Sequence, residues 1–329
     1  MANKRIFISK IFPELGAQML KDVGFEVTAW SQDRPMTQEE LIEKAKTHDA
    51  LFCSSSDKID KYFLNACSHL EIISQFSAGY DNIDVAEATR LGIPLGHAPN
   101  AMNDATADIA FGLMIAVSRK MFYMHKQIIN ANWTHFKPTA NLGMELKNKT
   151  LGIVGLGRIG TEMAKRCKGA YNMNIIYNNT KPNKQAEAEL NATYVDFKTL
   201  LQQSDVLSVH CALTEKTKGL FNAEAFAQMK PTAIFINASR GQVHNETDLI
   251  EALKNKTIWG AGLDVTNPEP MQHNNSLLHM ENVCVLPHIG SATVEARNEM
   301  ARLAATNIIE FYKNGTIPNM INPDIFLNN

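Results

Sequence analysis

The sequence predicts an α/β protein made of two doubly wound domains, each a parallel sheet covered by helices on both faces. The chain has 329 residues, more than one hydrophobic core usually holds, and its 45% hydrophobic and 20% charged residues are ordinary for a globular protein. Short apolar runs alternate with helical patterns, which is typical of parallel sheets. A glycine motif opens a second series of this alternation near the middle of the chain, at residues 155–160.

The first hundred residues contain five apolar runs that predict strands. The run Thr37–Lys46 between them predicts a helix, because Thr37 and Glu40 fit a capping box. One long apolar helix is then expected over Asp104–Asn130, with Asp104 as its N-cap. The five predicted strands are residues 5–9, 25–30, 50–54, 71–76 and 94–98.

From Thr150 the alternation restarts, and a last helix is expected over Thr293–Lys313, stopped by Asn314-Gly315. If this helix returns to the first domain, two chain crossings form a hinge for a cleft between the domains. We therefore expect a flavodoxin-like substrate domain at 1–102 plus 294–329 and a Rossmann dinucleotide-binding domain at 103–293. The predicted strands of the second series are residues 150–154, 174–177, 192–195, 205–210, 233–238, 258–265 and 283–287.

The glycine motif is Gly155-x-Gly157-x-x-Gly160, directly after the apolar run Thr150–Val154. In a dinucleotide site the first glycine permits the tight turn, the second lets the backbone approach the pyrophosphate, and the third lets helix and strand pack closely. Such a motif alone is weak, because glycine turns occur without ligands. Here a strand precedes it and a helix and second strand follow, so the sequence indicates a dinucleotide site.

Three polar residues in the second half each follow a predicted strand: Arg240, Glu269 and His288. Ligands of open α/β sheets bind at the carboxyl ends of strands, so these side chains are candidates for one catalytic site. Taken singly, each has another interpretation. They are a surface arginine, a solvated loop glutamate and a histidine that caps the final helix.

Four motifs together resemble the D-isomer-specific 2-hydroxyacid dehydrogenases, and the resemblance covers essentially the whole chain. Ser77–Asp81 is similar to the family's substrate-carboxylate loop, and Asp104–Ile109 to the start of its interdomain helix. Within the family, residues 132–138, 261–266 and 287–293 are most similar to the glyoxylate/hydroxypyruvate reductases. The four motifs are the glycine turn, Ser239-Arg240-Gly241, Pro268-Glu269-Pro270 and Pro287-His288-Ile289-Gly290.

The resemblance implies reduction of a small 2-oxo acid to the D-2-hydroxy acid, and the residue types suit that chemistry. His288 can supply the proton, Glu269 can stabilise its imidazolium, and Arg240 can bind the substrate carboxylate and polarise the ketone. Backbone N–H groups of Ala78 and Gly79 are expected to hold the other carboxylate oxygen. Glutamate at 269 argues against formate oxidation, since the formate dehydrogenases of this superfamily carry glutamine there.

The second strand of the nucleotide domain bears on the choice of cofactor. An acidic residue at its end would bind the ribose 2′-hydroxyl of NAD, but Asn178 and Asn179 stand there and Lys181 follows. NADP(H) is therefore favoured, with NAD(H) or dual use left open. For Asp264 and His210, turn capping and packing are equally plausible roles. Further cofactor contacts implied by the resemblance are Arg158, Ile159, Thr106, His210, Ala238, Asp264 and Gly290.

Phe136 lies where the related reductases place an aromatic residue that reaches the partner subunit's active site, and a tryptophan is expected there. This departure leaves open a longer substrate such as 2-ketogluconate, and simple packing in a dimer interface is an equal alternative. A homodimer is expected. The sequence also leaves open a reductase of a different 2-oxo acid and a dinucleotide-sensing corepressor. A phosphoglycerate dehydrogenase is disfavoured, because no regulatory domain follows residue 329.

Charge and composition argue against other classes. A net charge of −2 provides no basic surface for nucleic acid or an anionic membrane, and the longest apolar run, Ile109–Val117, is too short to span a bilayer. The five cysteines are scattered without Cys-x-x-Cys, so neither a metal site nor a disulfide framework is expected. No leader precedes the first strand, so we expect a cytoplasmic protein.

Overall fold

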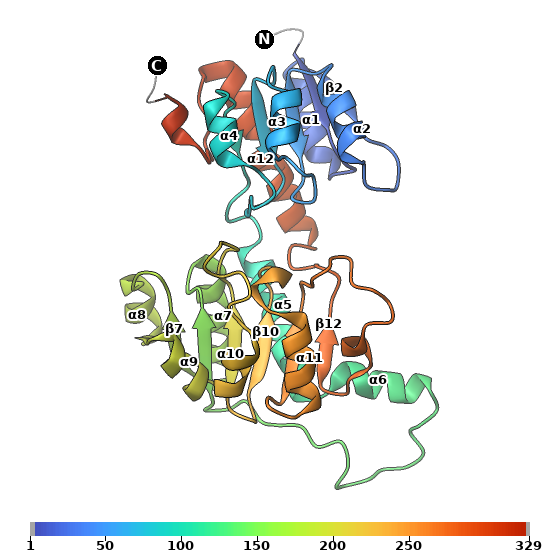
Figure 1. The fold of residues 1–329 in the computed structure, drawn as a ribbon, viewed down its shortest axis with the longest axis vertical. Helices are drawn as coiled ribbons and strands as arrows, with labels where there is room; N and C mark the ends of the chain where they lie inside the picture. Colours follow the sequence, from blue (N-terminus) through green and yellow to red (C-terminus); the bar gives the residue numbers. More distant parts are fainter. Residues whose placement is uncertain (1–3, 327–329) are drawn as a thin grey trace. The chain divides into compact units, whose positions relative to one another are not determined.

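The computed structural model describes residues 4–326 and divides into two compact units. Unit 1 comprises the chain up to Met102 and from Ala292 onward, and unit 2 is Asn103–Ser291 (Figure 1). The expected domain limits also include residues 1–3 and 327–329, which lie outside the described residues. Each unit contains one parallel sheet with helices, so the predicted α/β fold class is confirmed.

Unit 1 has a five-stranded parallel sheet in the order β2-β1-β3-β4-β5, which is the flavodoxin-like order. All residues of β3 and β4 are buried because helices cover both faces of the sheet, and β3 is a continuous apolar run. All five predicted strands are present, each shorter than its apolar run. They are β1 Arg5–Ile8, β2 Glu26–Ala29, β3 Ala50–Cys53, β4 Ile72–Gln75 and β5 Leu95–Gly96.

Helices α1 and α12 cover one face of this sheet and α2, α3 and α4 cover the other. The capping box predicted at Thr37 and Glu40 is present. The last helix ends where Gly315 adopts φ +66°, and the hydroxyl of Ser74 on β4 donates to the carbonyl of Ala304 at 2.8 Å. That bond fixes the helix on the sheet of unit 1. The helices are α1 Glu14–Asp22, α2 Gln38–Ala45, α3 Lys61–Ala66, α4 Val85–Arg90 and α12 Val294–Asn314, with a 3-10 turn η3 at Pro323–Phe326.

Unit 2 has a seven-stranded parallel sheet in the order β12-β11-β10-β9-β6-β7-β8. The order reverses between β6 and β9, and ligands of such sheets bind at the carboxyl ends of the strands at this switch point. All seven predicted strands are present. They are β6 Thr150–Val154, β7 Asn174–Asn178, β8 Thr193–Tyr194, β9 Val206–Val209, β10 Ile234–Asn237, β11 Gly260–Leu263 and β12 Val283–Val285.

Two hydrophobic clusters fill the faces of this sheet. Helices α5, α7 and α8 pack on one face, and α9, α10 and α11 on the other, as Figure 1 shows for the front layer. Within residues 4–326, none of the helices combines the length and the apolar character that crossing a bilayer requires. The bounds are α5 Asn103–Ser118, α7 Arg158–Tyr171, α8 Lys184–Leu190, α9 Phe197–Gln203, α10 Ala223–Gln228 and α11 Glu246–Lys254, with 3-10 turns η1 Gly241–Val243 and η2 Ser276–His279.

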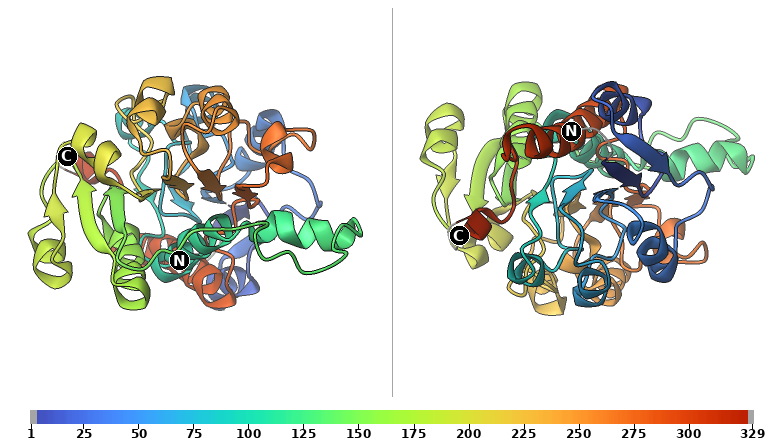
Figure 2. Two further views of the ribbon diagram at one scale, coloured as in Figure 1. Left: turned by 90° about the horizontal axis from the view of Figure 1, so that it is seen from below. Right: turned by 90° about the horizontal axis from the view of Figure 1, so that it is seen from above.

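The single long helix predicted over Asp104–Asn130 is wrong. The chain ends α5 at Ser118 and forms a separate α6, Met121–Ile129, because Lys120 between them adopts a left-handed φ of +54°. Asp104 is also not the N-cap, since it lies in the first turn of α5. While α5 is buried in unit 2, α6 and the segment that follows extend away from the body of that unit (Figure 2).

Candidate active site

The glycine turn connects β6 to α7 at the switch point of the unit 2 sheet. Gly155 adopts φ +92°, and a Cβ there would lie 2.6 Å from the backbone nitrogen of Cys211, which follows β9. At Gly160 a Cβ would lie 2.5 Å from the carbonyl oxygen of Gly155. Both positions therefore require glycine for close backbone packing, as the motif predicts.

The same turn has the features that a pyrophosphate requires. A Cβ on exposed Gly157 would meet no atom within 4 Å, so the backbone can be approached closely. The first helical bond of α7 runs from the N–H of Thr161 to Gly157, which leaves the N–H groups of Arg158 and Ile159 ahead of the hydrogen-bonded ladder. Together with the helix dipole, these groups favour an anion at this position.

The loop after β7 is tied to the glycine turn by asparagine side chains. Asn179 Oδ1 accepts from the N–H of Leu156 at 2.7 Å, and Asn183 Nδ2 donates to the carbonyl of Leu156 at 2.8 Å. Asn178 ends β7 and donates to the carbonyl of Val195 at 2.8 Å. Lys181 is exposed on this loop. The amides of Asn178 and Asn179 thus shape the loop, and Asn183 is a contributor that the sequence analysis missed.

His210 follows β9 and lies beside the glycine turn, because its backbone is 2.7 Å from a Cβ placed on Gly155. Its Nε2 is 2.8 Å from the hydroxyl of Ser208, and its Nδ1 is buried with no partner among the described residues. Burial lowers the pKa of this ring to about 4, so His210 is neutral in ordinary buffers.

His288 and Glu269 form a hydrogen-bonded pair, although 19 residues separate them in the chain. Nδ1 of His288 donates to Oε1 of Glu269 at 2.6 Å, with both side chains about 40% exposed (40% and 43%). This bond leaves Nε2 of His288 as the nitrogen that can exchange a proton with a substrate. Burial raises the pKa of the Glu269 carboxyl, but the hydrogen bond and the charge of His288 outweigh burial, so its pKa lies below the ordinary value.

The backbone at His288 has a φ of +53°, which is uncommon for a residue other than glycine. Asp264, at the end of β11, holds this turn: its two carboxylate oxygens each accept a backbone N–H at 2.8 Å, from Ile289 and Gly290, and its carbonyl accepts the N–H of His288. Thr106 on α5 adds a bond from its hydroxyl to the carbonyl of Gly290 at 3.2 Å. The contacts seen for Asp264, Thr106 and Gly290 thus position His288.

The alternative interpretation of His288 as the cap of the last helix is wrong, because Thr293 caps α12 and accepts the N–H of Ala296. Arg240 likewise lies in an ordered turn and not on an open surface. Its Nη1 donates to the carbonyl of Ser239 at 2.9 Å, and its own carbonyl accepts from Asn237 Nδ2 at 2.9 Å. Ala238 is buried next to it.

The predicted substrate-carboxylate loop lies in unit 1, after β4. The carbonyl of Gly79 accepts from Gln75 and Ser77, and the carbonyl of Ala78 accepts from Nδ1 of His97 at 2.9 Å. These bonds hold both carbonyls of the turn. Within residues 4–326 no acceptor is seen for the N–H groups of Ala78 and Gly79.

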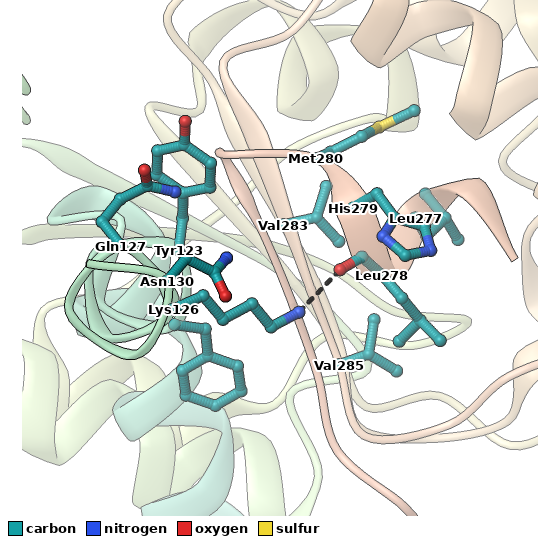
Figure 3. Close-up of a pocket in the computed structure, with 11 residues that line it drawn as sticks. Tyr123, Lys126, Gln127, Asn130, Leu277, Leu278, His279, Met280, Val283 and Val285 are labelled. Carbon is teal, nitrogen blue, oxygen red and sulfur yellow. Dashed lines mark hydrogen bonds between the residues drawn. The ribbon is translucent and has the colours of Figure 1, made fainter. Parts of the chain in front are cut away.

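Phe136 belongs to the segment after α6 and is 85% exposed. Near this segment, a hollow of about 190 Å³ lies between α6 and the η2–β12 segment (Figure 3). In Figure 3 the ammonium of Lys126 reaches across to the carbonyl of Leu278, at 2.8 Å. None of the predicted site residues lines this hollow.

Among residues 4–326, no three His, Cys, Asp or Glu side chains are grouped so that they could hold a metal ion.

A dinucleotide-type turn and a carboxylate–imidazole pair at the carboxyl ends of one Rossmann sheet define a nicotinamide-dependent dehydrogenase. Residues 111–290 match the family described as D-isomer specific 2-hydroxyacid dehydrogenase, NAD binding domain. The chain is 43% identical over 325 residues to the glyoxylate reductase of Thermococcus litoralis, covering 98% of this chain and 97% of that one. The chain therefore belongs to the D-isomer specific 2-hydroxyacid dehydrogenase family.

Solved structures agree with this assignment. The crystal structure of a glyoxylate reductase from Paecilomyes thermophila superposes with a TM-score of 0.87 at 32% identity, covering 98% of this chain and 99% of that one. An NADPH-dependent glyoxylate/hydroxypyruvate reductase from Sinorhizobium meliloti, in complex with NADP and malonate, gives a TM-score of 0.84 at 28% identity. The match covers 97% of this chain and 96% of that one. The resemblance inferred from the motifs is confirmed.

Proposed function

We propose that this protein reduces a small 2-oxo acid, glyoxylate or hydroxypyruvate, to the 2-hydroxy acid, with the D configuration where the product is chiral. The observation that carries the proposal is the 2.6 Å bond between His288 and Glu269 on loops that follow neighbouring strands. When bound, a reduced nicotinamide dinucleotide would supply the hydride. The residues of the chain then need to supply the proton, bind the carboxylate and polarise the ketone.

His288 is proposed as the proton donor. With Nδ1–H donating to Glu269, the proton on Nε2 is the one that can pass to the carbonyl oxygen as the alcohol forms. The Glu269 carboxylate accepts from Nδ1–H and holds the ring in one orientation. The turn held by Asp264 fixes the position of the ring.

Arg240 is proposed to bind the substrate carboxylate and to polarise the ketone, because a planar guanidinium matches a carboxylate with two parallel hydrogen bonds. The N–H groups of Ala78 and Gly79 are proposed to bind the other carboxylate oxygen. A carboxylate held by both sets of donors would present one face of the ketone to the hydride, which is the basis of stereospecificity.

The test is the loss of absorbance at 340 nm when the protein is mixed with NADPH and a panel of 2-oxo acids, including glyoxylate, hydroxypyruvate and 2-ketogluconate. We expect turnover of the two small acids. His288→Gln and Arg240→Ala should each abolish it, with NADPH binding retained. Near-normal kcat in His288→Gln would refute the proton donor, and no turnover of any acid by the unmodified protein would refute the reaction.

NADP(H) is proposed as the preferred dinucleotide. Asn178, at the end of β7, brings no negative charge against a 2′-phosphate, and exposed Lys181 supplies a cation on the same loop. The Asn179 and Asn183 bonds to Leu156 hold this loop against the glycine turn. We expect kcat/KM to be higher with NADPH than with NADH.

Lys181→Ala should lower kcat/KM for NADPH by about tenfold and leave that for NADH unchanged, because only the 2′-phosphate contact is lost. Lys184→Ala is the matched control, since the ammonium of Lys184 is already paired with Glu187 at 2.8 Å. If Lys181→Ala lowered kcat/KM equally for NADPH and NADH, or if the unmodified protein preferred NADH, the proposed selectivity would be contradicted.

A homodimer is proposed, formed through α6 and the segment that follows it. No side chain of α6 is buried, although most of them are apolar. Exposed apolar surface of this extent is typical of a protein–protein interface. The large apolar side chains exposed here are Met121, Ile128, Ile129, Trp133, Phe136 and Leu142.

Sedimentation velocity of the full chain should show a dimer, and Ile128→Glu/Ile129→Glu should shift it to monomer. Ile11→Glu is the control, because Ile11 is equally exposed, at 69%, but lies in unit 1. If Phe136 contributes to the partner's substrate site, Phe136→Ala raises KM for the 2-oxo acid without dissociating the dimer. A monomer in the unmodified protein would refute this part of the proposal.

A further inference from the structure

The turn that presents Arg240 is built around one buried side-chain amide. Asn237 is the last residue of β10 and is 0% exposed. Its Oδ1 accepts from the N–H and the hydroxyl of Ser239, each at 3.0 Å. Its Nδ2 donates to the carbonyl of Arg240 at 2.9 Å and contacts Nδ1 of His244 at 3.0 Å. All four hydrogen-bonding positions of the amide are therefore used.

Two backbone groups fix the orientation of this amide. The N–H of Ser239 can only donate, so the atom facing it is the oxygen, and the carbonyl of Arg240 can only accept, so the atom facing it is the nitrogen. The second hydrogen of Nδ2 then points to His244. Nδ1 of His244 must be the acceptor, and the ring proton lies on Nε2.

The ring of His244 is suited to this role. It is 2% exposed, and burial lowers its pKa to about 4, so the ring is neutral and Nδ1 keeps its lone pair. Its Nε2 is buried without a partner among the described residues, and the ring packs at 69° to that of Phe235.

The Arg240 turn is also in close contact with the loop that carries Glu269. A Cβ on Gly241 would overlap the carbonyl group of Thr266, and the hydroxyl of Thr266 donates to the carbonyl of Pro268 at 2.8 Å. Movement of the Ser239–Gly241 backbone would therefore disturb both loops. The amide of Asn237 is the group that fixes that backbone from inside the unit.

We propose that His244 is a positioning residue: by accepting from Asn237, it holds the amide that fixes the backbone at Arg240, and so sets the affinity for the substrate carboxylate. The inference rests on the proposed function, in which Arg240 binds that carboxylate. It concerns a side chain that touches neither substrate nor cofactor. Its effect is accordingly expected on binding of the 2-oxo acid and not on binding of the dinucleotide.

The experiment compares two substitutions of His244. His244→Leu removes the acceptor and should raise KM for the 2-oxo acid by about tenfold, with KM for NADPH changed less than about twofold. His244→Asn places an amide oxygen near the position of Nδ1 and should restore KM to within about threefold. Val243→Ala is the control for general loosening, because Val243 is fully buried beside the network but makes no side-chain hydrogen bond.

The outcomes separate this inference from the reaction itself. If His244→Leu turns over the 2-oxo acid with an unchanged KM, the positioning role is overturned and the reaction is intact. The same holds if Val243→Ala raises KM for the 2-oxo acid as much as His244→Leu does. The tautomer gives a readout that needs no turnover: ¹⁵N spectra of the histidine rings at pH 7, assigned with His244→Asn, should show Nε2–H at His244. A proton on Nδ1 would overturn the inference whatever the activity.

Discussion

The buried neutral state of His244 has a measurable consequence for stability. The pKa of this ring is about 4 in the folded protein and about 6.5 in an unfolded chain. Below pH 6.5 the unfolded chain therefore binds a proton that the folded protein does not, and the free energy of unfolding falls as the pH is lowered toward 4. Above pH 6.5 the contribution is fully present.

The magnitude follows from the two pKa values. They differ by about 2.5, which corresponds to about 3.4 kcal/mol when the whole interval is crossed. Between pH 7 and pH 5 the loss amounts to about 2 kcal/mol. His244→Asn keeps the acceptor for Asn237 but does not titrate, so its free energy of unfolding should fall by about 2 kcal/mol less than that of the unmodified protein over this interval.

The assay is urea unfolding of unit 2 at pH 7, 6 and 5. Trp259 lies in unit 2, so a background in which Trp30 and Trp133 are replaced by phenylalanine reports on that unit alone. Other titrating groups contribute equally to parent and variant and cancel in the difference. If His244→Asn loses as much free energy of unfolding as its parent between pH 7 and pH 5, the reasoning about the buried ring is wrong.

Three further predictions concern the site and its scaffold. Glu269→Gln keeps an acceptor for the ring of His288 but removes the negative charge of the carboxylate, so kcat/KM should fall by about 10- to 100-fold; an unchanged kcat/KM would count against the pairing. Gly155→Ala should weaken NADPH binding at least tenfold in a fluorescence titration, since its φ is +92° and a Cβ would meet backbone. Gly262→Ala should lower the free energy of unfolding by about 1–3 kcal/mol in thermal unfolding, because the added Cβ would lie 2.8 Å from a core side chain. Gly112→Ala, at an exposed position of α5, should raise the free energy of unfolding by about 0.5–1 kcal/mol. The reverse order would contradict the packing described for α5.

All twelve strands could be predicted from the sequence, and for the central strands of each sheet the physical reason is burial. A strand such as Ile72–Gln75 is covered by helices on both faces, so it has to be a short run of buried residues bounded by polar ones. The break between α5 and α6 could not be predicted in the same way. Arg119 and Lys120 are good helix formers, and the left-handed turn at Lys120 is stabilised by tertiary contacts of its ammonium with Glu281 and with the ring of Trp259.

The site shows the same division. The sequence shows that Arg240, Glu269 and His288 each follow a predicted strand. It also predicts that they lie near one another, because parallel strands present their carboxyl ends on one edge of the sheet. The strand order places β10, β11 and β12 side by side, and the bond between His288 and Glu269 depends on this adjacency. No spacing along the chain encodes that bond, since the two side chains are on loops of different length.

The Asn237–His244 contact was missed for a further reason. In the sequence His244 follows an ordinary hydrophobic residue ahead of a helix start, and a lone histidine there predicts only a partly exposed polar residue. The role of His244 follows from the direction in which the Asn237 amide donates. This amide has one orientation, because Ser239 and Arg240 each present a backbone group that allows no other. Donor and acceptor directions of this kind exist only once the strand has ended and the turn has closed. A polar residue that supports a catalytic turn from inside the core is therefore found from the hydrogen bonds that satisfy it, and the residue type alone does not reveal it.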